Sequence, residues 1–407
     1  MQYSTFAAID IGSYDVILEI FEISKKQGIR SVDKICHRME LGKDTYTLGK
    51  IRPEMEEELC RVLADFVRIM EGYRVDAYRA MASSAISEAA NSLYVLGKIR
   101  QLTGLSVTVL SNSEQRFLGY KALAAMEDNF NKIIEKGTAI LDLDGGSFQI
   151  SLFDKDALVT TQNIRMGSLR IRERLAGIQS ETEHYEEMVE ELIWNEVSSF
   201  KKMYLKDRKI ENIMLIGDVF TDSVYQNIEE KTTKIISREN FNTWYEKIIR
   251  QSPMELAVKL GIPLENASLM YPSAVIYKCL IDMMGAEHIW IPGVHMTRGI
   301  AYEYAEQMKL LKGGHNFEND ILMAAKNIGK RYAVNRPHVQ NLEMTALAMF
   351  DATKKMHGMK ERERLLLQMA VMLHDVGKYI SFNNVADSSY NIIMSNEIIG
   401  LSHIERE

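Results

Sequence analysis

The amino-acid sequence predicts a mixed α/β fold in two similar halves, followed by a unit made only of helices. Two segments carry the first part of this prediction, because in each an apolar strand pattern is interrupted by glycine and then resumes. The second part comes from the region after residue 316, where glycine and β-branched clusters thin out and Ala, Met, Leu, Lys and Glu recur at helical spacing. We therefore expect a two-lobed α/β body over about residues 1–310 and an all-α unit after it.

The first of these segments lies near the N-terminus. Phe6–Ser13 is an apolar run that ends in Gly-Ser, and Val16–Ile23 follows with β-branched residues in partial alternation, which predicts a strand, a tight turn and a second strand. Arg52–Tyr73 carries apolar residues at helical spacing, and Tyr78–Ser83 is typical of a short strand. These elements alternate as they do in α/β proteins.

The same pattern of strand, glycine turn and strand recurs over Thr138–Leu152. Glu211–Gly217 and Ile289–Gly293 are two further apolar runs that end at glycine, with amphipathic helical patterns between them. Because the glycine-interrupted hairpin occurs twice, the sequence predicts two related halves.

The boundaries follow from these patterns and from Gly313-Gly314, which breaks the chain before the helical unit. The last residues, Ile404–Glu407, have a helix-like charge pattern without a glycine stop, so we expect the helical unit to be incomplete in this chain. The predicted division is 1–125 for the first lobe, 126–312 for the second lobe and 316–407 for the helical domain.

Composition excludes several classes of protein. The 407 residues include 46% hydrophobic residues, enough to bury a core in each unit, and the net charge of −7 argues against nucleic acid as a partner. No apolar run is long enough for a membrane span and the N-terminus has no secretory pattern, so we expect a cytoplasmic protein without membrane contact. Three widely spaced cysteines without a CxxC argue against disulfides and thiolate zinc sites.

The two glycine turns have the residue types that phosphate chemistry needs. Glycine and serine N–H groups can approach phosphate oxygens without interference from a Cβ atom, and a carboxylate placed before each turn can hold Mg²⁺ or orient water. The alternative is that the two aspartates only occupy turn positions at the ends of strands and have no functional role. The predicted magnesium ligands are Asp10 and Asp142, and the predicted phosphate ligands in the turns are Gly12, Ser13, Gly145, Gly146 and Ser147.

The paired turns resemble those of the superfamily of actin, sugar kinases and chaperone ATPases, in which duplicated domains clamp phosphate between two loops. Within it, the sequence is most similar to the exopolyphosphatase and guanosine pentaphosphate phosphatase family over about residues 1–300. The stretches that carry the resemblance are Ala8–Ser13, Ala82–Asn91, Leu110–Gln115, Asp142–Ser147 and Met166–Arg170. The resemblance implies an actin-like, ribonuclease H-like fold with the site in the cleft between the lobes.

The resemblance also implies a reaction and a set of residues. Water would attack the terminal phosphoanhydride of inorganic polyphosphate or guanosine pentaphosphate, with Mg²⁺ bridging oxygens and loop amides stabilising the developing charge. By position in the motifs, Glu114, Gln115 and Gln149 correspond to the catalytic residues and Ser87 to a phosphate ligand. The resemblance leaves open whether this protein forms a homodimer.

Several of these positions carry a residue that differs from the family pattern. Gln115 and Gln149 stand where the family has glutamate, and an amide cannot take a proton from water. Ser87 replaces an arginine, which removes a fixed cation, and Asp144 adds an anion to a loop that should hold phosphate. Tyr14 stands where the family has asparagine.

Three functions follow from these substitutions. The first is a phosphohydrolase that uses Glu114 with Asp10 or Asp142 as acid–base groups, although Glu114 also fits a helix-capping role. The second is a catalytically degenerate protein that binds a phosphorylated ligand or a regulatory partner. The third, a kinase-like protein, is the weakest because Leu215–Val219 lacks the run of glycines that an adenosine would need.

The helical unit carries a separate motif. His338 and the pair His374-Asp375 resemble the metal ligands of the helical HD-type domain that follows in longer family members. Imidazole and carboxylate together suit divalent metals, so the resemblance implies a second divalent metal there. A core histidine beside a capping aspartate is the alternative.

Overall fold

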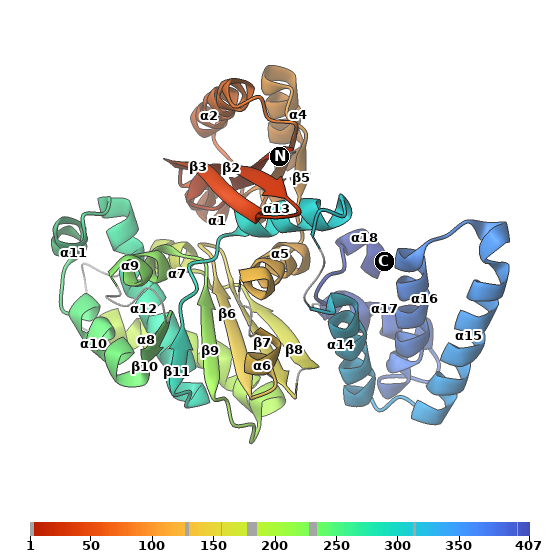
Figure 1. Ribbon diagram of the computed structural model, residues 1–407. Coiled ribbons are helices and arrows are strands. Elements are labelled where there is room, and N and C mark those ends of the chain that lie inside the picture. The colour runs from red at the N-terminus through yellow and green to blue at the C-terminus, as the bar shows by residue number, and fades with distance from the viewer. Residues whose placement is uncertain are drawn as a thin grey trace.

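The computed structural model describes residues 4–126, 130–155, 157–176, 185–227, 234–311, 315–396 and 398–407. Figure 1 shows two α/β lobes, one above the other, with a helical region beside the lower one. This arrangement confirms the predicted two-lobed α/β fold with a helical C-terminal region. The predicted break at Gly313-Gly314 lies outside the described residues.

The first lobe contains a five-stranded sheet in the order β3-β2-β1-β4-β5. Strand β1 (Ser4–Ile11) is antiparallel to β2 (Asp15–Ser24), which is antiparallel to β3 (Gly28–Arg38). On its other side β1 is parallel to β4 (Ala77–Ala82), which is parallel to β5 (Val107–Val109). The glycine turn predicted near the N-terminus therefore joins two paired strands.

One face of this sheet is covered by the long helix α2. Its residues Leu59, Leu63 and Phe66 are buried in the same cluster as Ile9 and Leu18 of the sheet. The first-lobe helices are α1 (Leu41–Leu48), α2 (Pro53–Gly72), α3 (Ser84–Ser87), α4 (Ser92–Thr103) and α5 (Asn112–Met126).

The second lobe repeats this pattern in a six-stranded sheet with the order β10-β11-β9-β6-β7-β8. As in the first lobe, one strand, β6, is antiparallel to the next and parallel to a later strand, β9. The two sheets thus share the strand arrangement expected for two similar halves. The strands are β6 (Thr138–Leu143), β7 (Phe148–Asp154), β8 (Ala157–Ile164), β9 (Asn212–Ile216), β10 (Ile235–Ser237) and β11 (His288–Trp290).

Helix α12 forms the centre of the second lobe's core. Its residues Met270, Ile276 and Tyr277 are fully buried with Leu141 and Ile213 of the sheet. The helices of this lobe are α6 (Phe130–Ile134), α7 (Ser168–Leu175), α8 (Tyr185–Phe200), the π-helical turn η1 (Lys201–Leu205), α9 (Val219–Asn227), α10 (Arg238–Ile249), α11 (Pro253–Leu260) and α12 (Leu264–Met284).

Helix α13 (Met296–Gln307) lies inside the range expected for the second lobe but packs against the first. Its residues Ile300 and Ala301 are buried against the sheet face opposite α2, and the ring of Tyr304 stacks on Phe6 at 4.2 Å between centroids. Figure 1 shows α13 running directly under the upper sheet. The first-lobe sheet is apolar on both faces, so a helix on each side is needed to cover it.

The helical region lies along β8, the edge strand of the second sheet. Its first helix, α14, contacts β8, and Asn327 Nδ2 donates to the Leu158 carbonyl at 2.9 Å. None of the described helices is long and apolar enough to cross a membrane. The elements are α14 (Phe317–Arg331), α15 (Arg336–His357), α16 (Glu361–Leu373), the 3₁₀ turn η2 (Val376–Tyr379), α17 (Val385–Ser395) and α18 (His403–Arg406).

Candidate active site in the cleft between the lobes

A cavity of about 250 Å³ lies between the two lobes. It is lined by residues from the first glycine turn, from the end of β6 and from the start of α9, and both Asp10 and Asp142 line it. These two aspartates occupy matching places, because each belongs to a strand that is antiparallel to the next strand and parallel to a later one. The duplicated fold thus brings the two predicted carboxylates to one cavity.

Asp10 lies on β1 and its Oδ1 is a buried oxygen with no hydrogen-bond partner. Burial raises the pKa of this carboxyl well above its usual range, and the nearby carboxylates of Asp15 and Asp144 raise the pKa further. An unpartnered buried carboxylate is costly unless a cation neutralises it. Asp10 is therefore suited to hold a cation.

Asp142 is paired with a residue that the sequence reasoning missed. The Arg116 side chain is buried, and its Nη1 donates to Asp142 Oδ1 at 2.9 Å while its Nη2 donates to Ser147 Oγ at 3.0 Å. Burial still raises the pKa of Asp142, although Arg116 lowers it. Arg116 thus ties the end of β6 to the second glycine turn. Its position directly after Glu114-Gln115 was the signal available in the sequence.

Asp144 and Gln115 form a second pair. Gln115 Nε2 donates to Asp144 Oδ2 at 3.2 Å, and the Gly145 N–H donates to Asp144 Oδ1 at 2.6 Å. Gln115 is 8% exposed, and its Oε1 has no hydrogen-bond partner. The carboxylate of Asp144 on the glycine loop therefore lies directly beside the Gln115 side chain. Both residues line the cavity.

The two glycine turns touch each other across the lobes. A Cβ atom placed on Gly145 would lie 3.1 Å from Ser13 Cβ, and one placed on Gly146 would lie 2.2 Å from the hydroxyl of Tyr46. That hydroxyl shares hydrogen bonds with Ser13 Oγ at 2.8 Å and with Ser84 Oγ at 2.9 Å. Of the predicted phosphate ligands in the turns, only Gly12 lines the cavity, and Ser13, Gly145, Gly146 and Ser147 are not part of its lining.

The other predicted site residues lie outside the cavity lining. Glu114 Oε2 accepts hydrogen bonds from Ser111 N at 2.9 Å and Ser111 Oγ at 2.7 Å, which is a helix-capping arrangement at the start of α5. Gln149 is buried on β7 opposite Asp142 and donates to Ser151 Oγ at 3.4 Å. Ser87 donates to the Ser84 carbonyl at 3.5 Å. The catalytic and phosphate-binding roles of Glu114, Gln149 and Ser87 stay predictions.

Three further aspartates that the sequence reasoning missed line the cavity: Asp15, Asp218 and Asp222. Burial raises the pKa of Asp15 to about 6, with Arg38 opposing the shift and Asp144 adding to it. Burial likewise raises the pKa of Asp218 to about 7, although Phe220 N and Thr221 N donate to its Oδ1 at 3.0 and 3.2 Å. Asp218 directly follows Gly217 at the end of a strand predicted from the sequence, whereas Asp10 and Asp142 come before their glycine turns.

The charges around the cavity favour a cation inside it. The lining side chains with fixed positive charge are Lys34, Arg38 and Arg116, whereas the acidic ones are Asp10, Asp15, Asp142, Asp144, Asp218 and Asp222. Carboxylate oxygens are the ligands that Mg²⁺ prefers in proteins. The unpartnered Asp10 Oδ1 and the crowding of acidic groups therefore fit a bound magnesium ion.

The helical region brings together the other predicted metal ligands. One ligand atom from each of His338, His374 and Asp375 lies within 4.8 Å of the other two. His374 Nδ1 is 2.7 Å from the Val371 carbonyl, which accepts its proton and leaves Nε2 for another partner, and Lys378 Nζ donates to Asp375 Oδ2 at 2.6 Å. The geometry fits a divalent metal with two nitrogen ligands and one oxygen ligand.

A sequence model of the Ppx/GppA phosphatase family matches residues 20–308, and a model of domain III of the same phosphatases matches residues 322–407. A guanosine-5'-triphosphate,3'-diphosphate pyrophosphatase of Photobacterium profundum is 19% identical over 407 residues, covering 98% of this chain and 78% of that protein. A bifunctional 3-dehydroquinate synthase/phosphatase of Fusobacterium nucleatum is 21% identical and covers 70% of this chain and 44% of that protein.

Solved structures share the fold. A Ppx/GppA family member of Aquifex aeolicus superposes with a TM-score of 0.62 at 17% identity, covering 75% of this chain and 99% of that chain. An exopolyphosphatase of Cytophaga hutchinsonii superposes with a TM-score of 0.66 at 17% identity, covering 75% of this chain and 98% of that chain.

Proposed function

Because the chain belongs to the Ppx/GppA phosphatase family, we propose that its interlobe cleft hydrolyses the terminal phosphoanhydride of inorganic polyphosphate or guanosine pentaphosphate. The observation that carries the proposal is the Asp144–Gln115 pair in the cavity. A carboxylate held by two donors on the phosphate loop can do the work of the glutamate that Gln115 replaces. The two substitutions then compensate each other.

In this proposal Asp144 is the general base. It accepts a proton from a water molecule whose oxygen forms a bond to the terminal phosphorus. The bond from that phosphorus to the bridging oxygen breaks, and its electron pair stays on the bridging oxygen. The proton held by Asp144 then passes to solvent. Gln115 Nε2 and Gly145 N hold the carboxylate of Asp144 in place at the cavity wall.

Mg²⁺ would be held by Asp10 with help from the neighbouring acidic side chains, and when bound it would neutralise phosphate oxygens. A highly anionic substrate cannot enter an acidic cavity without such a cation, because like charges at about 4 Å repel by about 4 kcal/mol at an effective dielectric constant near 20. Arg116 keeps Asp142 and Ser147 in place.

The cluster of His338, His374 and Asp375 is proposed as a separate divalent metal site in an HD-like helical domain. Its ligands come from α15 and from the end of α16, so a bound metal would tie these two helices together. This part of the proposal does not depend on the reaction in the cleft.

Phosphate release from long-chain polyphosphate and from guanosine pentaphosphate, measured by malachite green with Mg²⁺, tests the function. We expect release by the wild type and its loss in Asp144→Asn, which keeps the shape of the side chain and removes its basicity. Glu114→Ala is the matched control, since Glu114 caps α5 outside the cavity lining. Loss of activity in Glu114→Ala but not in Asp144→Asn would overturn the assignment of the base. If the protein binds these substrates but releases no phosphate, it is a binding protein and not a hydrolase.

A further inference from the structure

One wall of the interlobe cavity is formed by β3, the edge strand of the first lobe's sheet. Lys34, Cys36 and Arg38 line the cavity, whereas the residues between them do not. Successive side chains of a strand point to opposite faces, so these three share the face that is turned to the cavity. We call them the β3 wall. It presents two cations to whatever occupies the cleft.

The guanidinium of Arg38 lies in this wall without a hydrogen bond at two of its nitrogens. Its Nε and Nη1 are buried, and neither has a hydrogen-bond partner in the described part of the chain. The Oδ2 atom of Asp15 lies 4.0 Å from Nη1, which is too far for a hydrogen bond. Buried N–H groups without acceptors are costly and rare in folded proteins. Because Arg38 lines the cavity, a ligand in the cleft can supply the missing acceptor.

An aromatic ring holds the Arg38 side chain in place. The guanidinium carbon lies 5.1 Å from the centroid of the Tyr14 ring, within the range of a cation–π contact. Tyr14 also lines the cavity. The planar fork of Arg38 is thus held at the cavity wall, and such a fork can donate two parallel hydrogen bonds to one phosphate group.

Lys34 adds a second cation, whose acidic neighbour is engaged elsewhere. Lys34 lies opposite Glu19 in the β2–β3 pair. Glu19 accepts hydrogen bonds from Ser31 Oγ at 2.6 Å and from Thr297 Oγ1 at 2.5 Å. Among the residues that the structure describes, no carboxylate oxygen lies within 4.0 Å of Lys34 Nζ. The charge of Lys34 is therefore available to a ligand.

The β3 wall lies farther along the cleft than the place of the terminal phosphate. In the proposed reaction that phosphate lies at the glycine turns, beside Asp10 and Asp144. Strand β2 separates β3 from β1, which carries Asp10, so β3 lies two strand spacings, or about 10 Å, from β1. A phosphate group that contacts Arg38 is therefore the next one along the substrate.

We propose that Arg38 and Lys34 bind the phosphate of the leaving group and thereby select substrates with a second phosphate over phosphate monoesters. The inference rests on the proposed hydrolysis in the cleft. Arg116, the other fixed cation of the cavity, is already paired with Asp142. A monoester has no second phosphate, so it gains nothing from the β3 wall.

Calorimetric titration of the full chain in Mg²⁺ tests the β3 wall. Imidodiphosphate is the probe with a second phosphate, because its P–N–P bridge resists hydrolysis, and orthophosphate is the probe without one. Lys34→Met/Arg38→Met should weaken imidodiphosphate binding by about tenfold or more and leave orthophosphate binding unchanged. Arg38→Lys keeps the charge but loses the planar fork, so it should weaken imidodiphosphate binding less than Arg38→Met does.

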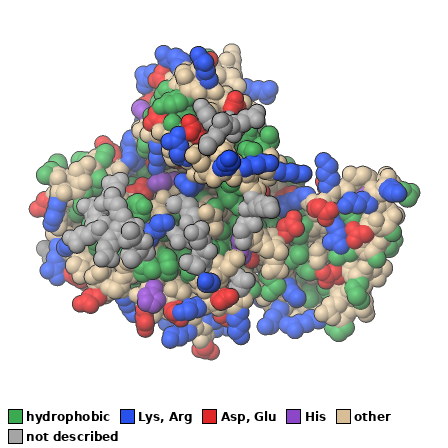
Figure 2. Space-filling model, in the orientation of Figure 1, with side chains coloured by type: hydrophobic (Ala, Val, Ile, Leu, Met, Phe, Trp, Pro, Cys, Tyr) green, Lys and Arg blue, Asp and Glu red, His purple; other side chains and the backbone are tan. Residues whose placement is uncertain are grey.

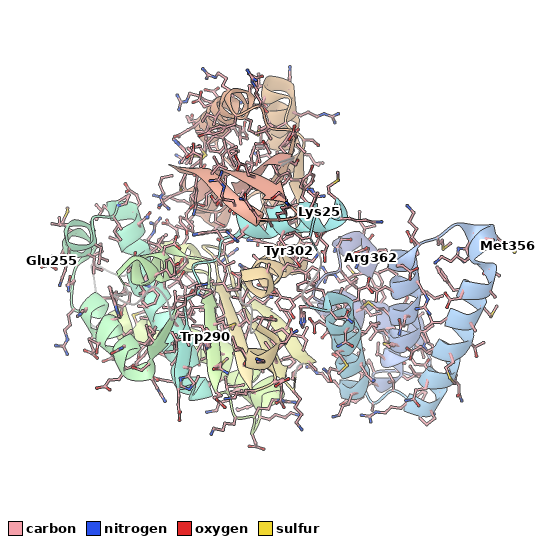
Figure 3. All side chains as sticks on the ribbon, viewed as in Figure 1. Lys25, Glu255, Trp290, Tyr302, Met356 and Arg362 are labelled. Carbon is pink, nitrogen blue, oxygen red and sulfur yellow. The ribbon has the colours of Figure 1, made fainter. Side chains whose placement is uncertain are left out.

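Lys and Arg side chains also lie on the surface along the boundary between the two lobes (Figure 2), so the loss of two cations needs a matched control. Lys25→Met/Arg30→Met removes the same two residue types from exposed positions of the first lobe, where Figure 3 labels Lys25. Neither residue lines the cavity, so this variant should bind both probes as the wild type does. Circular dichroism checks that each variant is folded.

Three results would overturn the proposal. They are absence of imidodiphosphate binding to the wild type, equal weakening of both probes by Lys34→Met/Arg38→Met, and equal weakening of imidodiphosphate binding by the control variant. The first would show that the cleft holds no diphosphate, the second that Arg38 and Lys34 contact the terminal phosphate, and the third that the effect is one of overall charge.

A turnover measurement separates this proposal from the proposed hydrolysis. In Lys34→Met/Arg38→Met, the ratio of kcat/KM for tripolyphosphate to kcat/KM for p-nitrophenyl phosphate should fall by about tenfold. If binding follows the expected pattern but the wild type releases no phosphate, the hydrolysis fails and the β3 wall stands. If the wild type releases phosphate but the double variant binds imidodiphosphate equally well, the β3 wall fails and the hydrolysis stands.

Discussion

The contact between Gln115 and Asp144 makes a quantitative prediction for Gln115→Glu. The substitution replaces an amide that donates to Asp144 Oδ2 at 3.2 Å with a second carboxylate. Two unit charges at that distance repel by about 1 kcal/mol in water and about 5 kcal/mol at an effective dielectric constant of 20. Asp144 is partly exposed, so the effect should lie between these limits. One pKa unit corresponds to about 1.4 kcal/mol, so one of the two carboxyls should titrate about one to three units above its usual pKa.

Glutamate at position 115 should therefore be harmful in this chain unless Asp144 is removed as well. We expect Gln115→Glu to lower the free energy of unfolding by about 1–3 kcal/mol at pH 8 and to lose that effect near pH 4, where protonation of one of the two carboxyls removes the repulsion. Asp144→Gly alone should lower phosphate release by roughly 100-fold or more, as loss of a general base does. The double variant should recover both stability and activity, which a double-mutant cycle measures.

Urea unfolding at pH 8 and pH 4 gives the stability terms, and malachite-green phosphate release gives the activity. The control is Gln101→Glu, which makes the same chemical change at an exposed position of α4. If Gln115→Glu is as stable and as active as the wild type while Asp144→Gly keeps full activity, the compensation between positions 115 and 144 is refuted.

The remaining predictions concern buried charges and metals. Arg116→Met leaves Asp142 buried without its cation and should lower the free energy of unfolding in urea by about 3–5 kcal/mol. The double variant Arg116→Met/Asp142→Asn should recover most of that loss. Equal losses in the single and double variants would contradict the pairing. The pKa of Asp218 in the folded protein is raised to about 7, so its carboxylate destabilises the fold increasingly as pH rises from about 4 to 7. Asp218→Asn, measured in EDTA, should therefore raise Tm at pH 8 but not at pH 4. An equal change in Tm at both pH values would show that titration of Asp218 is not the cause. His374→Ala should lower the amount of bound divalent metal in elemental analysis. His403→Ala, at an exposed histidine outside the cluster, should leave that amount unchanged. A wild type that carries no metal after dialysis against Zn²⁺ or Mn²⁺ would show that the cluster does not bind metal.

The sequence by itself determined the fold class and the family resemblance. Alternation and helical spacing are local properties, so the hairpin at Phe6–Ile23, its repeat at Thr138–Leu152 and the helix over Arg52–Tyr73 could be predicted from the chain alone. Aspartates placed before glycine turns likewise identified Asp10 and Asp142, both of which line the cleft. Strand β8, at the edge of the second sheet, was not among the strands predicted.

Only the tertiary structure decided which residues meet. The helix α13 follows the second lobe in sequence but covers the first, because the sheet of β1 and β2 has an apolar face left open by α2. Asp144 is an added negative charge in the sequence, whereas in the fold it accepts a hydrogen bond from Gln115, 29 residues earlier. Arg116 pairs with Asp142 across the same boundary between α5 and the second sheet. A periodic pattern tells which face of an element is buried, but the partner of a buried charge depends on long-range packing, so these pairs could be read only from the folded chain.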